Sequence, residues 1–319
     1  MTTKTIEQKE VVDLGRALRT RGYQFIAVTP ATHRRVLERA DAQGRASART
    51  LRDAFGWNRP FSRTEIEEEI FDLALRAGIL VAQGEARGES FRSRVRFSTL
   101  EQNIYVHSSY PTSEDDAVFF GPDTYRYCRF IRESCRDRRF RRAVDIGAGT
   151  GVGGLVAREF ADEVVLSDVN ERALEFAAVN VALADTNAST TSLQKSDVLR
   201  DIEGPIDLVV ANPPYMADPK SRAYRDGGGE FGEELTTRIV RESIERLSPG
   251  GRLVLYTGAA IVDGVDQIQK AVLPLCEGDG IAFRYEELDP DVFGEEITTN
   301  DAYARVERIA AVGLVVTKA

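Results

Sequence analysis

The sequence is poor in the residues that several common kinds of active site require. Its 319 residues include two histidines, His33 and His107, and three cysteines, Cys128, Cys135 and Cys276. So few histidines argue against a His-based catalytic triad or a multi-His metal site, and the cysteines show no metal-ligand spacing. An odd cysteine count in a chain of this length also argues against a disulfide scaffold. We therefore expect no metal centre.

Long apolar runs are also missing. No stretch approaches the roughly 18 consecutive apolar residues of a membrane helix, and the opening MTTKTIEQKEVVDLG lacks the apolar segment of a signal peptide. We expect a soluble, cytoplasmic protein without a membrane partner. The formal charge of −9 counts against a broad nucleic-acid surface, because clustered Lys and Arg supply phosphate neutralisation. A neutral or cationic partner is favoured instead.

The first third of the chain has a helical periodicity. Apolar residues three and four apart predict helices over 11–23, 31–44 and 64–80. The alternating stretches SFRSRVRFSTL and QNIYVHSSY, joined by a short turn, then predict a β-hairpin. We expect residues 1–112 to form a small helical module with a hairpin, for which a winged-helix-like arrangement is one option.

After about residue 115, strands alternate with helices, which is the signature of a doubly wound, mostly parallel sheet. The predicted strands lie near 142–146, 163–168, 190–194, 206–211, 251–257, 281–287 and 309–316. The fold class is therefore α/β, with a Rossmann-like seven-stranded domain over 113–319 that follows the N-terminal module.

A glycine-rich loop follows the first of these strands, in RRAVDIGAGTGVGGLVAREF. Glycine lets the backbone turn tightly and approach a ligand closely. Asp168 ends the next apolar run, about 20 residues further on, where a carboxylate accepts hydrogen bonds from ribose hydroxyls. The strand, the loop, the helix and this acid together predict a site for an adenosine-containing cofactor. Its candidate residues here are Gly147, Gly149, Gly151, Asp168 and Val169.

Carboxylates near the glycine loop favour one of two adenosine-containing cofactors, a dinucleotide or S-adenosylmethionine. Asp145 lies two residues before Gly147, where it would repel the pyrophosphate of a dinucleotide but suit the cationic sulfonium and ammonium groups of S-adenosylmethionine. Asp197 follows the third strand, where its carboxylate can accept a hydrogen bond from the adenine amino group while Val198 packs on the ring. We predict S-adenosylmethionine as the cofactor.

The motifs VVDIGAGTGVGG, VVLSDVN, KSDVL and LVVANPPYM occur in that order. Residues 115–319 thereby resemble the class I S-adenosylmethionine-dependent methyltransferases of the Asn-Pro-Pro-Tyr group, which methylate nitrogens conjugated to a π-system. The chain is similar within that group to the release-factor glutamine methyltransferases. The resemblance implies that Asn212 also lies near the cofactor and that the module over 1–112 recognises the substrate.

The Asn-Pro-Pro-Tyr corner, residues 212–215, fits that chemistry physically. A delocalised nitrogen is a poor nucleophile, and a site helps by accepting hydrogen bonds from its N–H groups as positive charge develops. Asn212 offers a side-chain carbonyl and Pro213 a backbone carbonyl, and the proline ring fixes the local dihedral angles. Tyr215 can lie against the flat acceptor and align it with the methyl group. These three residues are the predicted catalytic residues.

The identity of the acceptor stays open between two nitrogens. A protein glutamine amide follows from the resemblance. Two acidic loops after the corner and after the sixth strand instead suit a guanidine, as in arginine or a related small amino acid, through charge-assisted pairs. Tyr215 and the acids of these loops are the candidate substrate contacts; the acids are Glu230, Glu233, Asp291, Glu295 and Glu296.

Two other functions remain as alternatives. An adenine N6-methyltransferase of RNA or DNA would use the same corner, although the net negative charge opposes it. A non-enzymatic module that keeps only the cofactor pocket is the other, and the complete sequence Asn-Pro-Pro-Tyr speaks against it.

Overall fold

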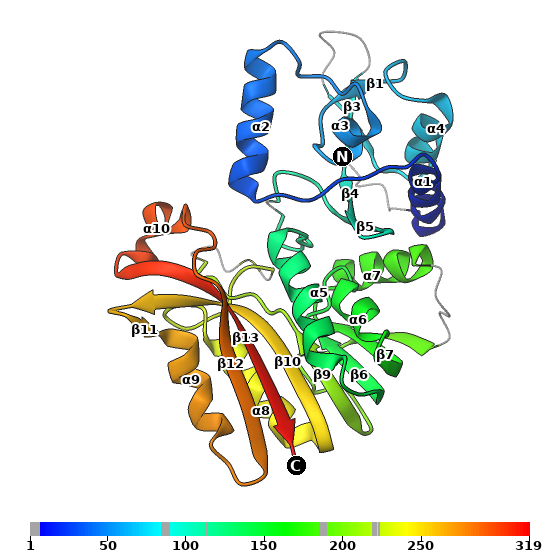
Figure 1. Ribbon diagram of the computed structural model, residues 1–319. Helices are drawn as coiled ribbons and strands as arrows, with labels where there is room; N and C mark the ends of the chain where they lie inside the picture. Colours follow the sequence, from blue (N-terminus) through cyan, green and yellow to red (C-terminus); the bar gives the residue numbers. More distant parts are fainter. Residues whose placement is uncertain (1–6, 84–89, 113, 185–189, 219–221, 223) are drawn as a thin grey trace. The chain divides into compact units, whose positions relative to one another are not determined.

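A computed structural model describes residues 7–83, 90–112, 114–184, 190–218, 222 and 224–319 (Figure 1). The chain divides into two compact units. The first contains the residues up to Pro122 and Ala178–Thr186, and the second contains Asp123–Ala177 and Asn187–Ala319. This division concerns compactness alone. The functional boundary expected at 112/113 and the winged-helix-like character of the first part stay predictions.

Among the described residues up to Pro122, the first unit contains four short helices. They are α1 (Gln8–Thr20), α2 (Pro30–Ala42), α3 (Leu51–Phe55) and α4 (Glu68–Arg76). Local sequence explains where two of them begin. The Thr29 hydroxyl accepts a hydrogen bond from the backbone N–H of Thr32 at 3.2 Å, and Pro30 occupies the first helical position of α2. Thr50 and Asp53 form a reciprocal capping box on α3.

Short antiparallel strands complete this unit. β1 (Phe61–Ser62), β2 (Leu80–Ala82) and β3 (Ser90–Ser93) form a sheet in the order β1-β3-β2. β4 (Val95–Leu100) and β5 (Asn103–Ser108) pair with Leu100 opposite Asn103, so the predicted hairpin is present. Edge-to-face contacts between buried phenylalanines, such as Phe55 with Phe97, fill the core.

The second unit is built on one large sheet. Its strands are β6 (Phe140–Ile146), β7 (Ala161–Asp168), β8 (Thr191–Lys195), β9 (Ile206–Ala211), β10 (Leu247–Val262), β11 (Val265–Asp266), β12 (Ile281–Asp289) and β13 (Val306–Lys318). The order is β12-β13-β10-β9-β6-β7-β8, with β11 paired to β10. The pairs from β10 to β8 are parallel, whereas β13 is antiparallel to both of its neighbours. The predicted seven-stranded, mostly parallel sheet is confirmed, and the two-residue β11 is an addition.

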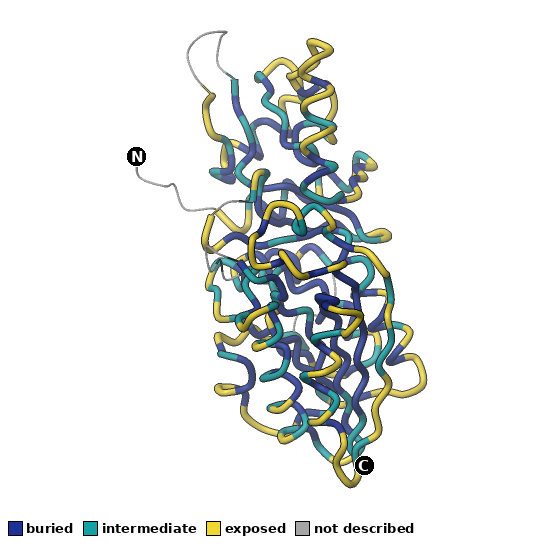
Figure 2. The backbone as a smooth tube through the Cα atoms, turned by 90° about the vertical axis from the view of Figure 1, so that its left-hand side faces the viewer, coloured by how far each residue is buried: buried dark blue, intermediate teal, exposed yellow. Residues whose placement is uncertain are grey.

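Helices cover both faces of the sheet (Figure 1). They are α5 (Pro122–Cys135), α6 (Val152–Ala157), α7 (Glu171–Leu183), α8 (Glu234–Arg246) and α9 (Gln267–Cys276). The four-residue α10 (Glu296–Thr299) lies beyond the strand ends, in the connection between β12 and β13. The pleat of β6 assigns the faces, because successive side chains alternate. Val144 and Ile146 join a buried cluster with Ile239 of α8 and Val272 of α9. Asp145 points to the opposite face, where α5 and α6 lie. The central strands β6, β9, β10 and β13 are mostly buried, whereas the edge strands β8 and β12 are mostly exposed or half-buried. Figure 2 shows the buried residues in the interior and the exposed ones along the outside.

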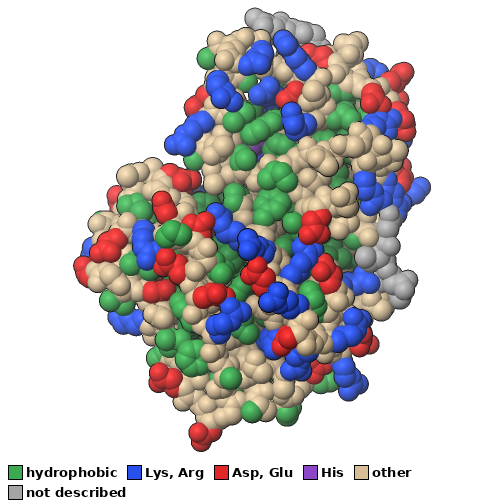
Figure 3. Space-filling model, in the orientation of Figure 1, with side chains coloured by type: hydrophobic (Ala, Val, Ile, Leu, Met, Phe, Trp, Pro, Cys, Tyr) green, Lys and Arg blue, Asp and Glu red, His purple; other side chains and the backbone are tan. Residues whose placement is uncertain are grey.

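The surface carries charges of both signs. Figure 3 shows one face, on which Lys and Arg side chains are interspersed with Asp and Glu. Within the described residues, no helix is both long and apolar enough to cross a membrane. The same residues contain no group of three or more His, Cys, Asp and Glu side chains suited to a metal ion.

Candidate active site

Three of the predicted motifs meet at one edge of the large sheet. The glycine loop follows β6, Asp168 ends β7, and the Asn-Pro-Pro-Tyr corner follows β9. β6 pairs in parallel with both β7 and β9, so the carboxyl ends of all three strands lie together. Ligands of open α/β sheets bind at this edge. The fold therefore brings the glycine loop close to the Asn-Pro-Pro-Tyr corner, although these two segments are about 65 residues apart in the chain.

The glycine loop has one open side and one packed side. Gly147, Gly149 and Gly151 have φ angles of 64°, 54° and 75°, in the region that residues with a Cβ rarely adopt. Gly147 is exposed, and a Cβ placed on it would meet no atom within 4 Å. A Cβ on Gly151 would instead come within 3.0 Å of Leu166. The loop thus leaves room for a ligand at Gly147 and packs on the protein at Gly151.

Asp145 supports this loop from behind. Its carboxylate is 1% exposed and accepts hydrogen bonds from the backbone N–H of Gly154 at 2.7 Å and from the Tyr127 hydroxyl at 3.1 Å. Burial raises the pKa of Asp145 to about 7, despite the opposing effect of these hydrogen bonds. Both oxygens thus have protein partners, and these contacts favour a role in holding the loop. The direct cofactor contact predicted for Asp145 stays a prediction.

Asp168 links the loop to the end of β7. Its carboxylate accepts the backbone N–H of Gly149 and that of Asn170, each at 2.9 Å. Burial raises the pKa of Asp168, while these backbone hydrogen bonds oppose the rise. The neighbouring side chain of Val169 is 51% exposed. An acid and an exposed apolar side chain therefore lie side by side in sequence at the strand end, as a ribose and an adenine ring would require.

The third predicted cofactor segment looks different. Asp197 accepts hydrogen bonds from Arg238 at 2.8 Å and Arg200 at 2.7 Å, and Arg238 lowers the pKa of Asp197. Each carboxylate oxygen keeps another lone pair, so an additional donor can still bind. Val198 is only 4% exposed and belongs to the core cluster. Its burial favours a packing role over contact with a ring, and both adenine contacts stay predictions.

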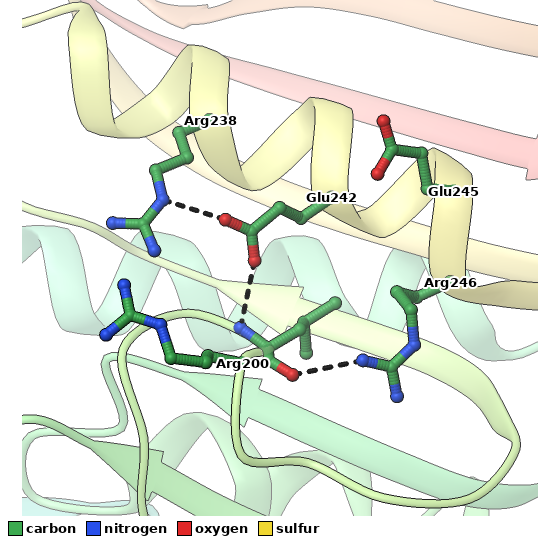
Figure 4. Close-up of a pocket in the computed structure, with 6 residues that line it drawn as sticks. Arg200, Arg238, Glu242, Glu245 and Arg246 are labelled. Carbon is green, nitrogen blue, oxygen red and sulfur yellow. Dashed lines mark hydrogen bonds and ion pairs between the residues drawn. The ribbon is translucent and has the colours of Figure 1, made fainter.

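The Arg238 side chain also borders a concave surface of about 470 Å³ (Figure 4). The walls of this hollow are formed by α8 and the segment after β8; the lining residues are Leu199, Arg200, Arg238, Glu242, Glu245 and Arg246. Arg238 pairs with Glu242 at 2.7 Å, and Arg246 donates to the carbonyl of Leu199 at 3.1 Å. The chain's own groups thus satisfy several of these charges, and none of the predicted site residues lines the hollow.

The residues of the Asn-Pro-Pro-Tyr corner are half-buried or buried. Asn212 is half-buried, Pro213 is buried, and Tyr215 is 9% exposed. The segment that follows folds back on the corner, since Gly227 donates its backbone N–H to the carbonyl of Met216 at 2.9 Å. A Cβ on Gly232 would lie 2.1 Å from the Tyr215 carbonyl oxygen. These glycines are therefore explained by packing against the corner.

Four residues that sequence reasoning missed support Tyr215, either directly or through Asp123. Its hydroxyl donates a hydrogen bond to Asp123, which is buried in the first turn of α5. Asp123 also accepts from the Tyr256 hydroxyl at 2.8 Å and from Arg126 at 3.1 Å. Gly258 lies against the Tyr215 ring. No local pattern signals these contacts, because the partners come from α5 and β10.

The acidic loops are only partly available to a substrate. Glu230 and Asp291 are exposed, and Glu295 is partly buried. Glu296 instead forms an ion pair with Arg225. Glu233 accepts the backbone N–H of Phe231 at 2.9 Å. The chain's own donors therefore engage two of these five acids, and the contact of any of them with a substrate stays a prediction.

Comparisons with known proteins agree with this arrangement. A family model for the methyltransferase small domain matches residues 126–262. A release factor glutamine methyltransferase of Deinococcus radiodurans is 32% identical over 156 residues, which cover 45% of this chain and 55% of the relative. A ribosomal RNA small subunit methyltransferase C of Haemophilus influenzae is 25% identical over 166 residues, covering 50% of this chain and 46% of the relative.

The crystal structure of a methyltransferase from Pyrococcus furiosus is similar with a TM-score of 0.42 and 21% identity, covering 63% of this chain and 88% of that one. The chain spans about half the length of the relatives it matches in sequence. The family match covers the glycine loop, the end of β7 and the Asn-Pro-Pro-Tyr corner. Residues 126–262 therefore resemble a methyltransferase small domain, and over about half of its length the chain is similar to release factor glutamine methyltransferases.

Proposed function

We propose that the chain is an S-adenosylmethionine-dependent N-methyltransferase that acts on a planar side-chain nitrogen, with the amide of a protein glutamine as the first candidate. One observation carries this proposal. The rigid Asn-Pro-Pro-Tyr corner follows β9 at the same sheet edge as the glycine loop after β6, and β6 and β9 are adjacent. The methyl acceptor and the cofactor then share one edge of the sheet.

The residues of the glycine loop fit the cofactor. Gly147 leaves open space, Asp168 presents a carboxylate for ribose hydroxyls, and Val169 offers an exposed apolar side chain for adenine. When bound, S-adenosylmethionine supplies an electrophilic methyl group. Asp145 acts indirectly in this proposal, because it fixes the loop through Gly154 and Tyr127.

The corner acts on the acceptor. The Asn212 side-chain carbonyl and the Pro213 backbone carbonyl accept hydrogen bonds from the two N–H groups of the nitrogen, which stabilises the positive charge that develops as the new N–C bond forms. The Tyr215 ring lies along the flat group and limits its rotation. Because the corner is rigid, both acceptors are in position before the substrate arrives.

The choice of glutamine comes from the named relatives, and one observation favours a second acceptor. Glu230 and Asp291 are exposed acids in the loops after the corner and after β12. A guanidinium, as in free arginine, would pair with such carboxylates. We assign the N-terminal module, residues 1–112, to substrate recognition in either case.

A methyl-transfer assay with labelled S-adenosylmethionine tests the proposal. The acceptors are a release factor, its glutamine-to-alanine variant, free arginine, free glutamine, and RNA or DNA. We expect label in the unaltered release factor and not in its variant, with mass spectrometry locating the methyl group on the amide. Label in arginine alone supports the second acceptor, label in nucleic acid alone supports an adenine methyltransferase, and no label at all contradicts the enzymatic proposal.

The role of the corner predicts a separation of binding from chemistry. Asn212→Ala removes one acceptor from the nitrogen, so we expect kcat to fall by about 10²-fold or more. Calorimetric affinity for S-adenosylmethionine should stay within about threefold of that of the unaltered chain, since the loss falls mainly on the acceptor. Near-normal turnover in this variant would remove Asn212 from the mechanism.

A further inference from the structure

The aromatic ring of the corner is anchored at its hydroxyl. The Tyr215 hydroxyl donates a hydrogen bond to one carboxylate oxygen of Asp123, whose residue is 4% exposed. The other oxygen accepts from Tyr256 at 2.8 Å and from Arg126 at 3.1 Å. Arg126 also pairs with Asp289 at 2.7 Å, so the guanidinium bridges two carboxylates. Three donors thereby converge on one buried carboxylate.

The ring itself is fixed by packing. A Cβ on Gly258 of β10 would lie 2.2 Å from Cε2 and 2.3 Å from Cδ2 of Tyr215, so only glycine leaves space for the ring there. Phe293 contributes a tilted contact, with 6.2 Å between the two ring centroids. The hydroxyl and the ring are therefore constrained independently, one by a hydrogen bond and the other by close packing.

We propose that Asp123 is a positioning residue for methyl transfer, which orients the Tyr215 ring against the acceptor by accepting the hydrogen bond of its hydroxyl. This inference rests on the proposed function, because the ring needs an orientation only if it aligns a flat nitrogen. It adds to that function a residue that lies 92 positions before the tyrosine and outside the Asn-Pro-Pro-Tyr motif.

A role in stability alone explains the arrangement less well. A buried carboxylate loses its hydration, and burial raises the pKa of Asp123 even though three donors favour its charged form. A phenylalanine packed on Gly258 would fill the same volume without needing a buried acceptor. The hydrogen bond between Tyr215 and Asp123 adds an orientation that packing alone does not give. Packing still permits small rotations of the ring, whereas the hydrogen bond fixes the position of its hydroxyl end. Transfer reactions depend on alignment within about 10–20°.

Two conservative variants test the proposal. Tyr215→Phe keeps the ring and removes the anchor, whereas Tyr285→Phe removes the same kind of bond from a second tyrosine, whose hydroxyl donates to Asp266 at 2.8 Å. We expect kcat to fall about tenfold in Tyr215→Phe and to stay unchanged in Tyr285→Phe. The affinity for S-adenosylmethionine should be unchanged in both. Equal kcat values for these two variants would overturn the proposal.

A double-mutant cycle assigns the effect to Asp123. Asp123→Ala should lower kcat at least as much as Tyr215→Phe does, since it also removes the contacts of Tyr256 and Arg126. The double variant should show no further loss beyond Asp123→Ala, because the contact between Tyr215 and Asp123 is lost in both single variants. Additive losses would overturn the proposal.

A spectroscopic readout separates this inference from the proposed function. In the proton spectrum of the unaltered chain, we expect a slowly exchanging hydroxyl resonance of Tyr215 that disappears in Tyr215→Phe and in Asp123→Ala and persists in Tyr256→Phe. Its absence in the unaltered chain contradicts the anchor even if methyl transfer is found. Methyl transfer to none of the acceptors, with the resonance present, contradicts the proposed function instead and leaves no reaction for the anchor to serve, which also overturns the positioning role.

Discussion

The two halves of the site are supported in different ways. In the glycine loop, the supporting acids are close in sequence: Asp145 accepts from Gly154, nine positions later, and Asp168 accepts from Gly149, 19 positions earlier. In the Asn-Pro-Pro-Tyr corner, the hydroxyl of Tyr215 reaches Asp123, 92 positions away. The supports of the loop thus come from nearby in the chain, with Tyr127 of α5 only 18 positions before Asp145, whereas the corner depends on the more distant Asp123 of α5 and on Gly258 of β10.

This difference has a physical origin. A parallel sheet puts consecutive strand ends beside each other, so a loop and the acid of the following strand meet through the fold's shortest connection. The corner follows β9, and the elements that cover it arrive from before β6 and after α8. Its rigidity is therefore partly intrinsic, through the two prolines, and partly supplied by tertiary packing.

The largest effect should come from the buried acid behind the loop. The pKa of Asp145 is raised from 3.8 to about 7, so the folded state binds a proton more tightly than the unfolded state does. This stabilisation is fully present below pH 3.8 and is lost as the pH rises through about 7. Since one pKa unit corresponds to about 1.4 kcal/mol, the loss is about 4 kcal/mol.

Urea unfolding of the cofactor-free chain at pH 4 and pH 8 checks this prediction against Asp145→Asn, which cannot ionise. The free energy of unfolding of the unaltered chain should fall relative to that of the variant as the pH rises. Carboxylates with lowered pKa values, such as Asp218 at about 2, follow the opposite trend in both proteins and cancel in the difference. An equal pH dependence of the two proteins would show that Asp145 ionises normally.

The central strands of the sheet could be predicted from the sequence because they are apolar runs bounded by turn residues, as β9 illustrates between Pro205 and Pro213. The glycine loop and Asp168 could be predicted because their meaning depends on local spacing. Asp123 and Gly258 could not, since a single acid at a helix start and a single glycine in a strand acquire a role only when Tyr215 lies between them.

The glycine-rich segment after the corner shows the same limit. A Cβ on Gly232 would lie 2.1 Å from the Tyr215 carbonyl oxygen, and one on Gly227 would lie 2.8 Å from that of Pro214, so tertiary packing explains these two glycines. Contact of this segment with a substrate stays a prediction. Likewise, Val198 follows the predicted acid Asp197 in sequence, yet its side chain is buried in the core. Side-chain direction at a strand end depends on the local backbone, and Val198 has a φ of 56° that no periodicity predicts.

The next largest effect tests the tertiary support of the corner. Gly258→Ala places a methyl group 2.2 Å from the Tyr215 ring, so the ring or the strand must move. We expect about 2 kcal/mol of lost stability, typical of overpacking, and a fall in kcat of more than about tenfold. Gly278→Ala is the matched control, because its Cβ would meet only Ile281 at 3.7 Å. Normal turnover in Gly258→Ala would mean that the prolines alone position the ring.

Asp168→Ala should cause a loss of comparable size, but in the affinity for the cofactor and not in kcat. The carboxylate is the proposed acceptor of ribose hydroxyls, and hydrogen bonds to a charged group contribute about 1.5–3 kcal/mol, so affinity for S-adenosylmethionine should fall roughly 30-fold. Calorimetry measures the affinity directly. At saturating cofactor, kcat should return to within about threefold of normal, because the corner is untouched. A lasting loss of kcat would mean that the two halves are not independent.

The smallest effect distinguishes the two valines that the sequence placed beside the cofactor. Val169 is 51% exposed, so Val169→Ala removes two methyl groups from the proposed adenine contact and should weaken cofactor binding about fivefold, at about 1 kcal/mol. Its free energy of unfolding should hardly change. Val198 is 4% exposed, and Val198→Ala should lower stability by about 1–2 kcal/mol through the lost core packing. Cofactor affinity of the folded fraction should then be nearly normal. Calorimetry measures the cofactor affinity of both variants, and urea unfolding measures their stability. A loss of affinity in Val198→Ala alone would show that Val198, and not Val169, contacts the adenine ring.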